Sequence, residues 1–189
     1  MTIALPPPQT PTMGNLEHLR AAAAHGFEFD FVQYHVHVSG NDKLPNAEIE
    51  QAFVKAPTLS AGVKRITGLY YRAGYPVTRV LYALSGNDLY IQIVVKGVDR
   101  VESAAPLGSY FKGLAGKQPL TDTQLQRRRL LANVAADRAG VNSNLSVANA
   151  GDDAHPDYVL KAPVEGEPGW AVHGLLDYGN IGNRYVGKD

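Results

Sequence analysis

The sequence predicts an α+β protein made of two tandem β-α-α-β-β units, each a three-stranded mixed sheet with two helices on one face. Apolar residues recur every three or four positions over 59–71, and every second position over 77–84 and 89–95. A Ser-Gly-Asn-Asp turn joins the two alternating segments and is short enough to force an antiparallel hairpin. The same order of elements recurs in weaker form after residue 99, which predicts a second unit.

Composition limits the class of protein. The 189 residues suit one ordinary domain or two small ones, and 44% hydrophobic residues are enough for a buried core. Eighteen basic and eighteen acidic residues give a net charge of zero, which argues against a dedicated nucleic-acid binder. The absence of cysteine excludes disulfides, thiolate catalysis and Cys-ligated zinc. No apolar run approaches the ~20 residues of a membrane helix, and residues 1–11 lack the pattern of a signal peptide.

The first 26 residues read as an arm. The segment LPPPQTPT is rich in proline and is expected to stay extended and unpaired. Asn15 can cap a short helix over Leu16–Ala24, which Gly26 would end. Residues 1–26 are therefore expected to lie outside the core.

The first unit is expected over residues 27–98. Phenylalanines alternate with acidic residues and the apolar phase then shifts, which predicts one strand over Phe27–Val38 with a bulge or kink near Val32-Gln33. Asn46 would cap a short helix that Pro57 ends. Its expected buried residues are Ile49, Ala52 and Phe53. The helix over 59–71 and the hairpin complete a sheet covered on one side.

The second unit is expected over residues 99–164, from a short strand at 99–103. A short helix follows, with Leu107, Phe111 and Leu114 on one face. Thr121 and Gln124 form a capping box that opens a helix to about Arg138. The buried candidates of that helix are Leu125, Leu131 and Val134. Strands at 141–147 and 158–160 would close the sheet.

Residues 165–189 differ in character, with a Gly/Pro linker followed by Trp170–Tyr178. This segment alternates over nine residues and has aromatic residues at both ends, which is typical of a tilted membrane β-strand. The same pattern would equally suit an edge strand of the second unit. Both interpretations remain open at this point.

Two short segments carry a family resemblance. The β-α-α-β-β order, with Gly40-Asn41 after the first strand and Tyr71-Arg72-Ala73-Gly74-Tyr75 before the second, resembles a POTRA domain. Two such units after a Pro-rich arm are similar to the periplasmic part of two-partner secretion outer-membrane transporters of the haemolysin-activator type. The segment Leu176–Gly187, with Asp177-Tyr178-Gly179, resembles the start of their membrane barrel.

Two positions depart from the family's pattern. The first unit ends in Lys96-Gly97 where the family usually has an acidic residue before glycine, and Arg138-Ala139-Gly140 stands where a Pro-Gly pair is common. These departures concern the subfamily more than the fold. The resemblance implies a Pro-rich arm and helix at 1–26, POTRA-like domains at 27–98 and 99–164, and a linker with the first strand of a truncated barrel at 165–189.

The resemblance implies a function in protein transport. The chain would be the periplasm-facing module of a bacterial outer-membrane protein that captures a secreted partner in extended form and passes it to a β-barrel pore. It would need no cofactor, would not be an enzyme and would bind no nucleic acid. The alternative is a free-standing periplasmic scaffold or chaperone-like interaction module.

A guest that arrives extended can add a strand to an open sheet edge. The expected groove lies between the strand 77–84 and the helix 59–71, with amphipathic tyrosines as contact surface. These tyrosines would equally well cover the seam between helix and sheet. The predicted partner-binding residues are Val77, Arg79, Leu81, Tyr70, Tyr71, Tyr75 and Tyr82.

Other polar clusters have simpler explanations. His35 and His37 point the same way on a strand and would suit a metal, but no third ligand is evident nearby in the sequence, so solvent exposure is the simpler account. Asp152-Asp153-Ala154-His155 with Asp157 lies in a loop that needs polar residues anyway. Arg127, Arg128 and Arg129 point in different directions on a helix. The sequence assigns no metal site and no catalytic group.

Overall fold

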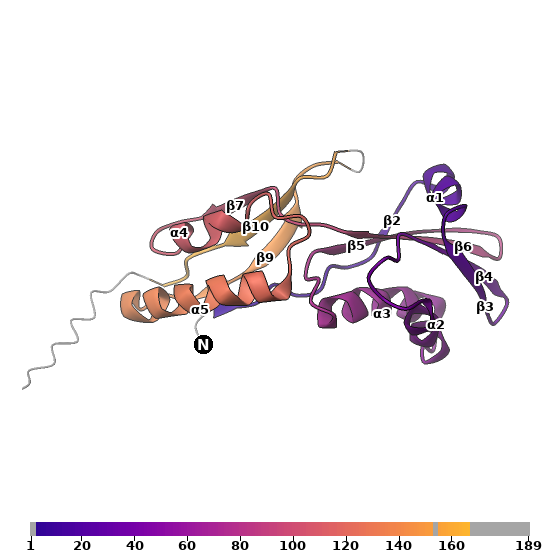
Figure 1. Cartoon of the computed structure of the whole chain (residues 1–189), viewed down its shortest axis with the longest axis horizontal. Coiled ribbons are helices and arrows are strands. Elements are labelled where there is room, and N and C mark those ends of the chain that lie inside the picture. Colours follow the sequence, from indigo (N-terminus) through magenta and orange to yellow (C-terminus); the bar gives the residue numbers. More distant parts are fainter. Residues whose placement is uncertain (1–2, 153–154, 167–189) are drawn as a thin grey trace, which may run out of the picture.

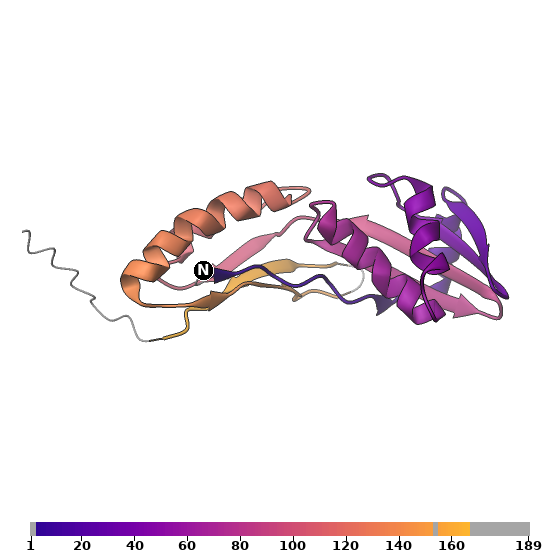
Figure 2. The ribbon, with the colours of Figure 1, turned by 90° about the horizontal axis from the view of Figure 1, so that it is seen from below.

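A computed structural model describes residues 3–152 and 155–166. The expected strand Trp170–Tyr178 and the barrel-like segment after it lie outside the described residues. The described chain is elongated, with a five-stranded and a three-stranded sheet arranged end to end and helices alongside them (Figures 1 and 2). None of its helices is long and apolar enough to cross a membrane.

Five strands form the sheet of the first unit: two are the expected hairpin strands, two come from the single strand expected over Phe27–Val38, and one comes from the arm. The second half of the first expected strand runs parallel to the last expected strand, and the middle expected strand pairs antiparallel with the last. An additional strand lies at each edge. The spatial order is β2 (Thr12–Met13), β5 (Thr78–Ser85), β6 (Asp88–Val95), β4 (Tyr34–Ser39) and β3 (Phe27–Phe31).

Helices cover both faces of this sheet (Figure 1). α2 (Asn46–Val54) and α3 (Leu59–Arg72) lie on one face, where Phe53, Ile66 and Tyr70 are fully buried against Val80 and Ile91. The Thr58 side chain caps α3 by accepting from the Ala61 N–H. The other face is partly covered by α1 (Leu16–Ala23), whose Leu19 packs on Ala83 and Tyr90.

Residues 27–39 form a hairpin, so the expectation of a single kinked strand is wrong. Phe27 lies opposite Val38 and Phe31 opposite Tyr34, and the chain reverses at Val32-Gln33, with Val32 at φ 56°. A two-residue turn keeps its flanking residues on one face of the sheet. The shift in apolar phase that suggested a bulge is therefore the mark of a tight turn.

The second unit repeats the pairing of the first with fewer strands. β10 (Tyr158–Ala162) is central, parallel to β7 (Arg100–Ser103) and antiparallel to β9 (Ser146–Asn149). Between β7 and β9 the chain forms α4 (Gly108–Phe111), the 3-10 turn η1 (Lys112–Leu114) and α5 (Asp122–Ala139). The expected β-α-α-β-β order is therefore present twice.

α5 begins and ends as expected but buries a different face. The Thr121–Gln124 capping box is formed, and Gly140 ends the helix at φ 67°. Leu125 is buried, whereas Leu131 and Val134 are each 52% exposed, so their expected burial is wrong. The buried face instead carries Ala132, Asn133 and Ala136, because small residues let the N-terminal arm lie close against the helix.

The arm is extended but not unpaired. Its first described residues form β1 (Ile3–Ala4), which pairs in parallel with β8 (Ser143–Asn144) of the second unit. Ile3 is fully buried in the second core, and its N–H donates to Asn133 Oδ1. Further along, β2 pairs with β5 of the first unit. One end of the arm is therefore part of the second core, contrary to the expectation for residues 1–26.

Hydrogen bonds from backbone N–H groups join the two units near the start of β5 and the end of β6. The Asp122 N–H donates to Gly74 O at 2.8 Å, and the Gly97 N–H donates to Gln118 Oε1 at 2.8 Å. Gly74 has φ 94°, a conformation that glycine adopts without strain. Val77 belongs to the core cluster of the second unit. The Arg-x-Gly-Tyr segment thus forms part of the junction.

Candidate functional site

A groove lies between the arm, α3 and the hairpin β5–β6. It encloses a cavity of about 360 Å³ with mostly apolar walls. Most of its lining comes from α3 and the two strands, and one wall comes from the arm. The lining residues are Thr10, Pro11, Leu59, Ser60, Val63, Lys64, Tyr82, Leu84 and Leu89. This is the groove that the sequence places beside β5, with a wall from the arm that the sequence analysis missed.

The outer edge of β5 already holds an extended segment. Thr12 pairs with Leu81 and Met13 with Tyr82 in parallel register, and the Gly14 N–H donates to Tyr82 O at 2.9 Å. β5 runs from Thr78 to Ser85, so the arm pairs with only part of it. The edge therefore accepts an added strand, and here the chain itself supplies it.

Two of the seven predicted contact residues are inaccessible in this conformation. Tyr70 is fully buried, and its hydroxyl donates to Asn41 Oδ1. Burial raises the pKa of Tyr70 above the usual range of a phenol. Val77 is 1% exposed and packs in the core of the second unit. Tyr70 therefore belongs to the core of the first unit and Val77 to the core of the second.

The other five predicted residues lie around β5 on different sides. Tyr82 lines the cavity, whereas Leu81 faces the opposite side of the sheet with Leu19 and Ala83. The Tyr71 hydroxyl donates to Pro6 O at 2.8 Å, which ties α3 to the arm, and burial raises its pKa. Tyr75 packs beside Tyr70 against the first core, and Arg79 is half-buried on β5. The seven residues do not form one surface, and their role in partner binding stays a prediction.

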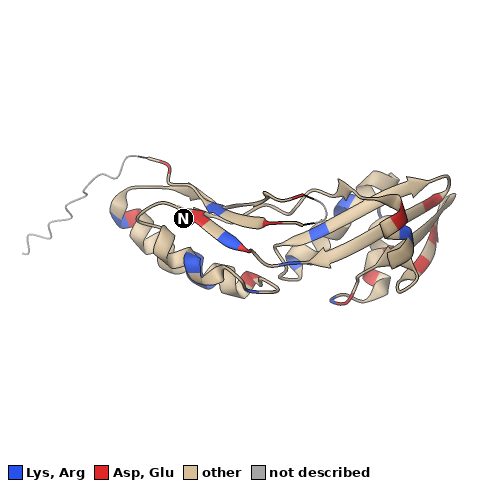
Figure 3. Ribbon diagram, turned by 90° about the horizontal axis from the view of Figure 1, so that it is seen from above, with Lys and Arg blue, Asp and Glu red and all other residues tan. Residues whose placement is uncertain are grey.

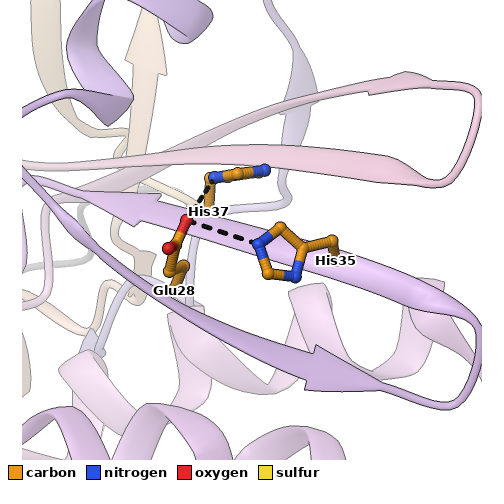
Figure 4. Close-up of side chains that lie close together, drawn as sticks. All are labelled: Glu28, His35 and His37. Atoms are coloured by element: carbon orange, nitrogen blue, oxygen red, sulfur yellow. Dashed lines mark ion pairs between the residues drawn. The ribbon is translucent and has the colours of Figure 1, made fainter.

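A second cluster lies on the other face of the sheet, where β3 and β4 pair. Glu28 Oε2 is 3.4 Å from His35 Nε2 and 3.2 Å from His37 Nδ1 (Figure 4). His35 Nδ1 is 2.6 Å from Asp30 Oδ1, and this hydrogen bond raises the pKa of His35. His37 Nε2 is 3.1 Å from Asp88 Oδ1.

Glu28 lies beside both histidines, where the sequence showed no third candidate ligand. Glu28 faces His37 across the β3–β4 hairpin, in the register Glu28↔His37. A prediction of a tight turn at Val32-Gln33 would have indicated this pairing. The sequence analysis expected a single kinked strand there and therefore missed it. Among the residues that the structure describes, this is the single group of three or more that could hold a metal ion.

The remaining polar candidates are explained by local structure. Arg129 donates to Gln126 and to Ile3 O, so it joins α5 to the arm. Asp157 forms a 3.0 Å ion pair with Arg100 across β7 and β10. The His155 N–H donates to Asp152 Oδ1 within the loop, while Asp153 and Ala154 lie outside the described residues.

Comparisons with known proteins give structural neighbours alone. No family model matches the sequence, and no curated protein matches it significantly. CdiB from Escherichia coli aligns over 79% of this chain and 29% of its own, at 16% identity and a TM-score of 0.45. The N-terminal domain of Omp85 from the thermophilic cyanobacterium Thermosynechococcus elongatus aligns over 73% of this chain and 68% of its own, at 14% identity and a TM-score of 0.37.

A crystal structure of Haemophilus influenzae BamA POTRA3-5 aligns over 70% of this chain and 65% of its own, at 11% identity and a TM-score of 0.37. The strand pairing of the chain itself defines the fold. In the first unit β6 is parallel to β4 and antiparallel to β5, and in the second unit β10 is parallel to β7 and antiparallel to β9. Both units therefore contain the mixed three-stranded pairing that the sequence predicts. The predicted α+β fold class is confirmed. The chain spans 29% of the length of the CdiB chain that it matches.

Proposed function

We propose that this chain is the periplasmic polypeptide-recognition module of an outer-membrane protein transporter, and that it binds an unfolded secreted protein by strand addition at β5. The observation that carries the proposal is the position of β2. This extended segment of the arm already pairs with the outer edge of β5, beside a cavity with mostly apolar walls. A guest strand would use the same edge, in place of the arm or in continuation of it.

Strand addition suits a transporter because affinity comes from main-chain hydrogen bonds, which any extended sequence offers. The cavity beside Tyr82 and Leu84 would receive one apolar side chain of the guest and give moderate selectivity. β2 pairs with only Leu81 and Tyr82. The ladder between arm and edge is therefore short, and a longer guest strand would replace it with more hydrogen bonds.

The charge distribution agrees with recognition through the backbone. Basic and acidic positions are interspersed along both units (Figure 3), and the net charge of the sequence is zero. Such a surface does not steer partners of one sign over long range. The proposed partner is thus a secreted protein in extended form, selected by groove shape more than by charge.

The groove can be tested by NMR with an extended peptide of alternating apolar and polar residues. We expect saturable shifts at Lys64, Tyr82 and Leu84, which line the cavity. Leu84→Asp should weaken binding by about 10-fold, because a carboxylate would stand where an apolar side chain docks. Val54→Asp is the matched control, since Val54 on α2 is also exposed and apolar. Shifts confined to other surfaces, or equal effects of both variants, would contradict strand addition at β5.

The transport role can be tested separately from the groove. In a transporter subunit, the coding sequence beyond residue 189 should continue with segments of ~10 alternating residues, as in a membrane β-barrel. A reading frame that stops at residue 189 would instead favour the free-standing scaffold or chaperone-like module. If a peptide binds to the groove but no barrel follows in the coding sequence, strand addition at β5 is supported and the transporter role is contradicted.

A further inference from the structure

We propose that Glu28, His35 and His37 form a binding site for a divalent transition-metal ion of the Zn²⁺ class, at the edge of the first sheet. The three side chains converge from two paired strands, β3 and β4, on the face opposite the groove (Figure 4). The inference is independent of the proposed function, because none of the three residues lines the groove.

The spacing of the ligand atoms fits a tetrahedral ion. Bonds of roughly 2.0–2.1 Å to histidine nitrogen and carboxylate oxygen place neighbouring ligand atoms of a tetrahedron about 3.3 Å apart. Glu28 Oε2 lies 3.2 Å from His37 Nδ1 and 3.4 Å from His35 Nε2. One ligand atom from each of the three residues lies within 4.8 Å of the others. A small adjustment of side-chain torsions would bring all three to bonding distance.

The second nitrogen of each imidazole is held by a carboxylate. Asp30 Oδ1 contacts His35 Nδ1 at 2.6 Å, and Asp88 Oδ1 contacts His37 Nε2 at 3.1 Å. A carboxylate on the far nitrogen fixes the tautomer and orientation of a ligating histidine and raises its basicity. Both histidines therefore direct their remaining nitrogen toward Glu28, as metal ligands would.

His37 is also held by packing. Its side chain is 18% exposed and stacks on the Tyr90 ring, with centroids 4.7 Å apart and planes 9° apart. His35 is more open, at 42% exposed, and Glu28 at 62%. The site thus combines one rigid ligand with two that can move to meet an ion, and its open side leaves room for a water molecule as fourth ligand.

The donor set selects the class of metal. Two imidazoles with one carboxylate suit Zn²⁺ and neighbouring late transition metals, whereas Mg²⁺ and Ca²⁺ prefer oxygen ligands throughout. Three carboxylates, of Glu28, Asp30 and Asp88, surround the two histidines, and they outnumber the single guanidinium of Arg20, which lies over the Tyr90 ring at 5.6 Å. The local charge therefore favours a dication.

The test is a titration of the tag-free chain with Zn²⁺. Calorimetry measures the binding, and thermal unfolding measures the change in Tm. We expect one saturable equivalent of Zn²⁺, a rise in Tm on binding, and no comparable effect of Mg²⁺ or Ca²⁺. His35→Gln and Glu28→Gln should each abolish the saturable phase. Asp30→Asn should weaken the affinity about 10-fold while the stoichiometry stays at one, because it loosens the orientation of His35.

His155→Gln is the matched control, because the His155 side chain is 90% exposed in the loop after β9. It should leave the Zn²⁺ titration unchanged. Binding that survives both His35→Gln and Glu28→Gln, or the absence of any saturable phase in the unaltered chain, would overturn the proposal. Variants that unfold are recognised by circular dichroism. In that case the NMR signals of the His35 and His37 imidazoles in the unaltered chain test the proposal, since Zn²⁺ bound at the site must shift both.

Discussion

The two units share one pairing scheme but differ in what surrounds it. In the first, two edge strands widen the sheet to five, and helices lie on both faces. In the second, the sheet keeps three strands, and the arm adds Ile3 to the core beside α5. The shared scheme sets the fold, while segments outside it complete each core. The second unit depends on residues that lie more than a hundred positions away in the sequence.

Both proposed functional sites lie in the first unit, whose sheet has the two additional edge strands. The groove and the Glu28–His35–His37 cluster both lie in the first unit, on opposite faces of its sheet. Each uses one of the added edge strands, β2 for the groove and β3 for the cluster. The second unit instead presents Leu130, Leu131 and Val134 on the exposed face of α5.

The sharpest test of the comparison is Ile3→Ala. We expect a loss of about 2–5 kcal/mol in the free energy of unfolding, because a fully buried side chain leaves a cavity in the second core. Denaturant unfolding gives the magnitude, and hydrogen exchange shows where protection is lost. The loss should be concentrated in α5 and β8.

Met13→Ala is the control for the arm, since Met13 is 73% exposed. It should change stability by less than about 0.5 kcal/mol. If Ile3→Ala were equally mild, the arm would not be part of the second core and the contrast between the units would fail.

The second test compares how closely the helices of the two units pack around a glycine. A Cβ added at Gly62 in α3 would lie 2.4 Å from Phe53 Cδ1, so Gly62→Ala should cost about 1–3 kcal/mol. In the second unit, a Cβ at Gly113 would meet the end of the flexible Arg128 side chain at 2.9 Å. Gly113→Ala should therefore be nearly neutral. Equal losses for the two variants in thermal unfolding would show that the helices of both units pack equally closely.

The smallest expected effect concerns the Tyr70 hydroxyl. Tyr70→Phe should cost about 1 kcal/mol at neutral pH, because Asn41 loses its hydrogen-bond donor. Burial raises the pKa of Tyr70 above its ordinary value of 10.0, so the folded state keeps the neutral phenol while the unfolded chain ionises. This part of the stability is fully present below pH 10 and decreases as the pH rises above it.

Urea unfolding at several alkaline pH values checks this prediction. The Tyr70→Phe variant should lose less stability above pH 10 than the unaltered chain. Tyr110→Phe in the second unit serves as the control and should keep the steeper alkaline loss. Identical slopes for all three proteins would show that Tyr70 is not responsible for the pH dependence.

Local patterns allowed much of the fold to be predicted. The spacing of apolar residues indicated α3, β5 and β6 to within about one residue, and the Thr121–Gln124 capping box marked the start of α5. These features depend on neighbours in the chain, which a sequence displays directly. Repetition of the element order then predicted the second unit.

The candidate sites were predicted only in part. The groove beside β5 was expected, but its wall from Thr10 and Pro11 was not, because a Pro-rich segment carries no pattern that tells where it docks. The third ligand of the histidine cluster was missed for a related reason. Glu28 meets His37 only after the hairpin register is known, and that register depends on the turn at Val32-Gln33.

The sequence by itself determined the repeated element order and the bounds of most helices and strands, since these follow from periodicity and capping over a few residues. The tertiary structure alone decided which distant segments meet: Ile3 with α5, and Thr12 with Leu81. The physical reason is that such contacts are set by strand register and by the space left between packed elements. Neither quantity is encoded in any short stretch of chain.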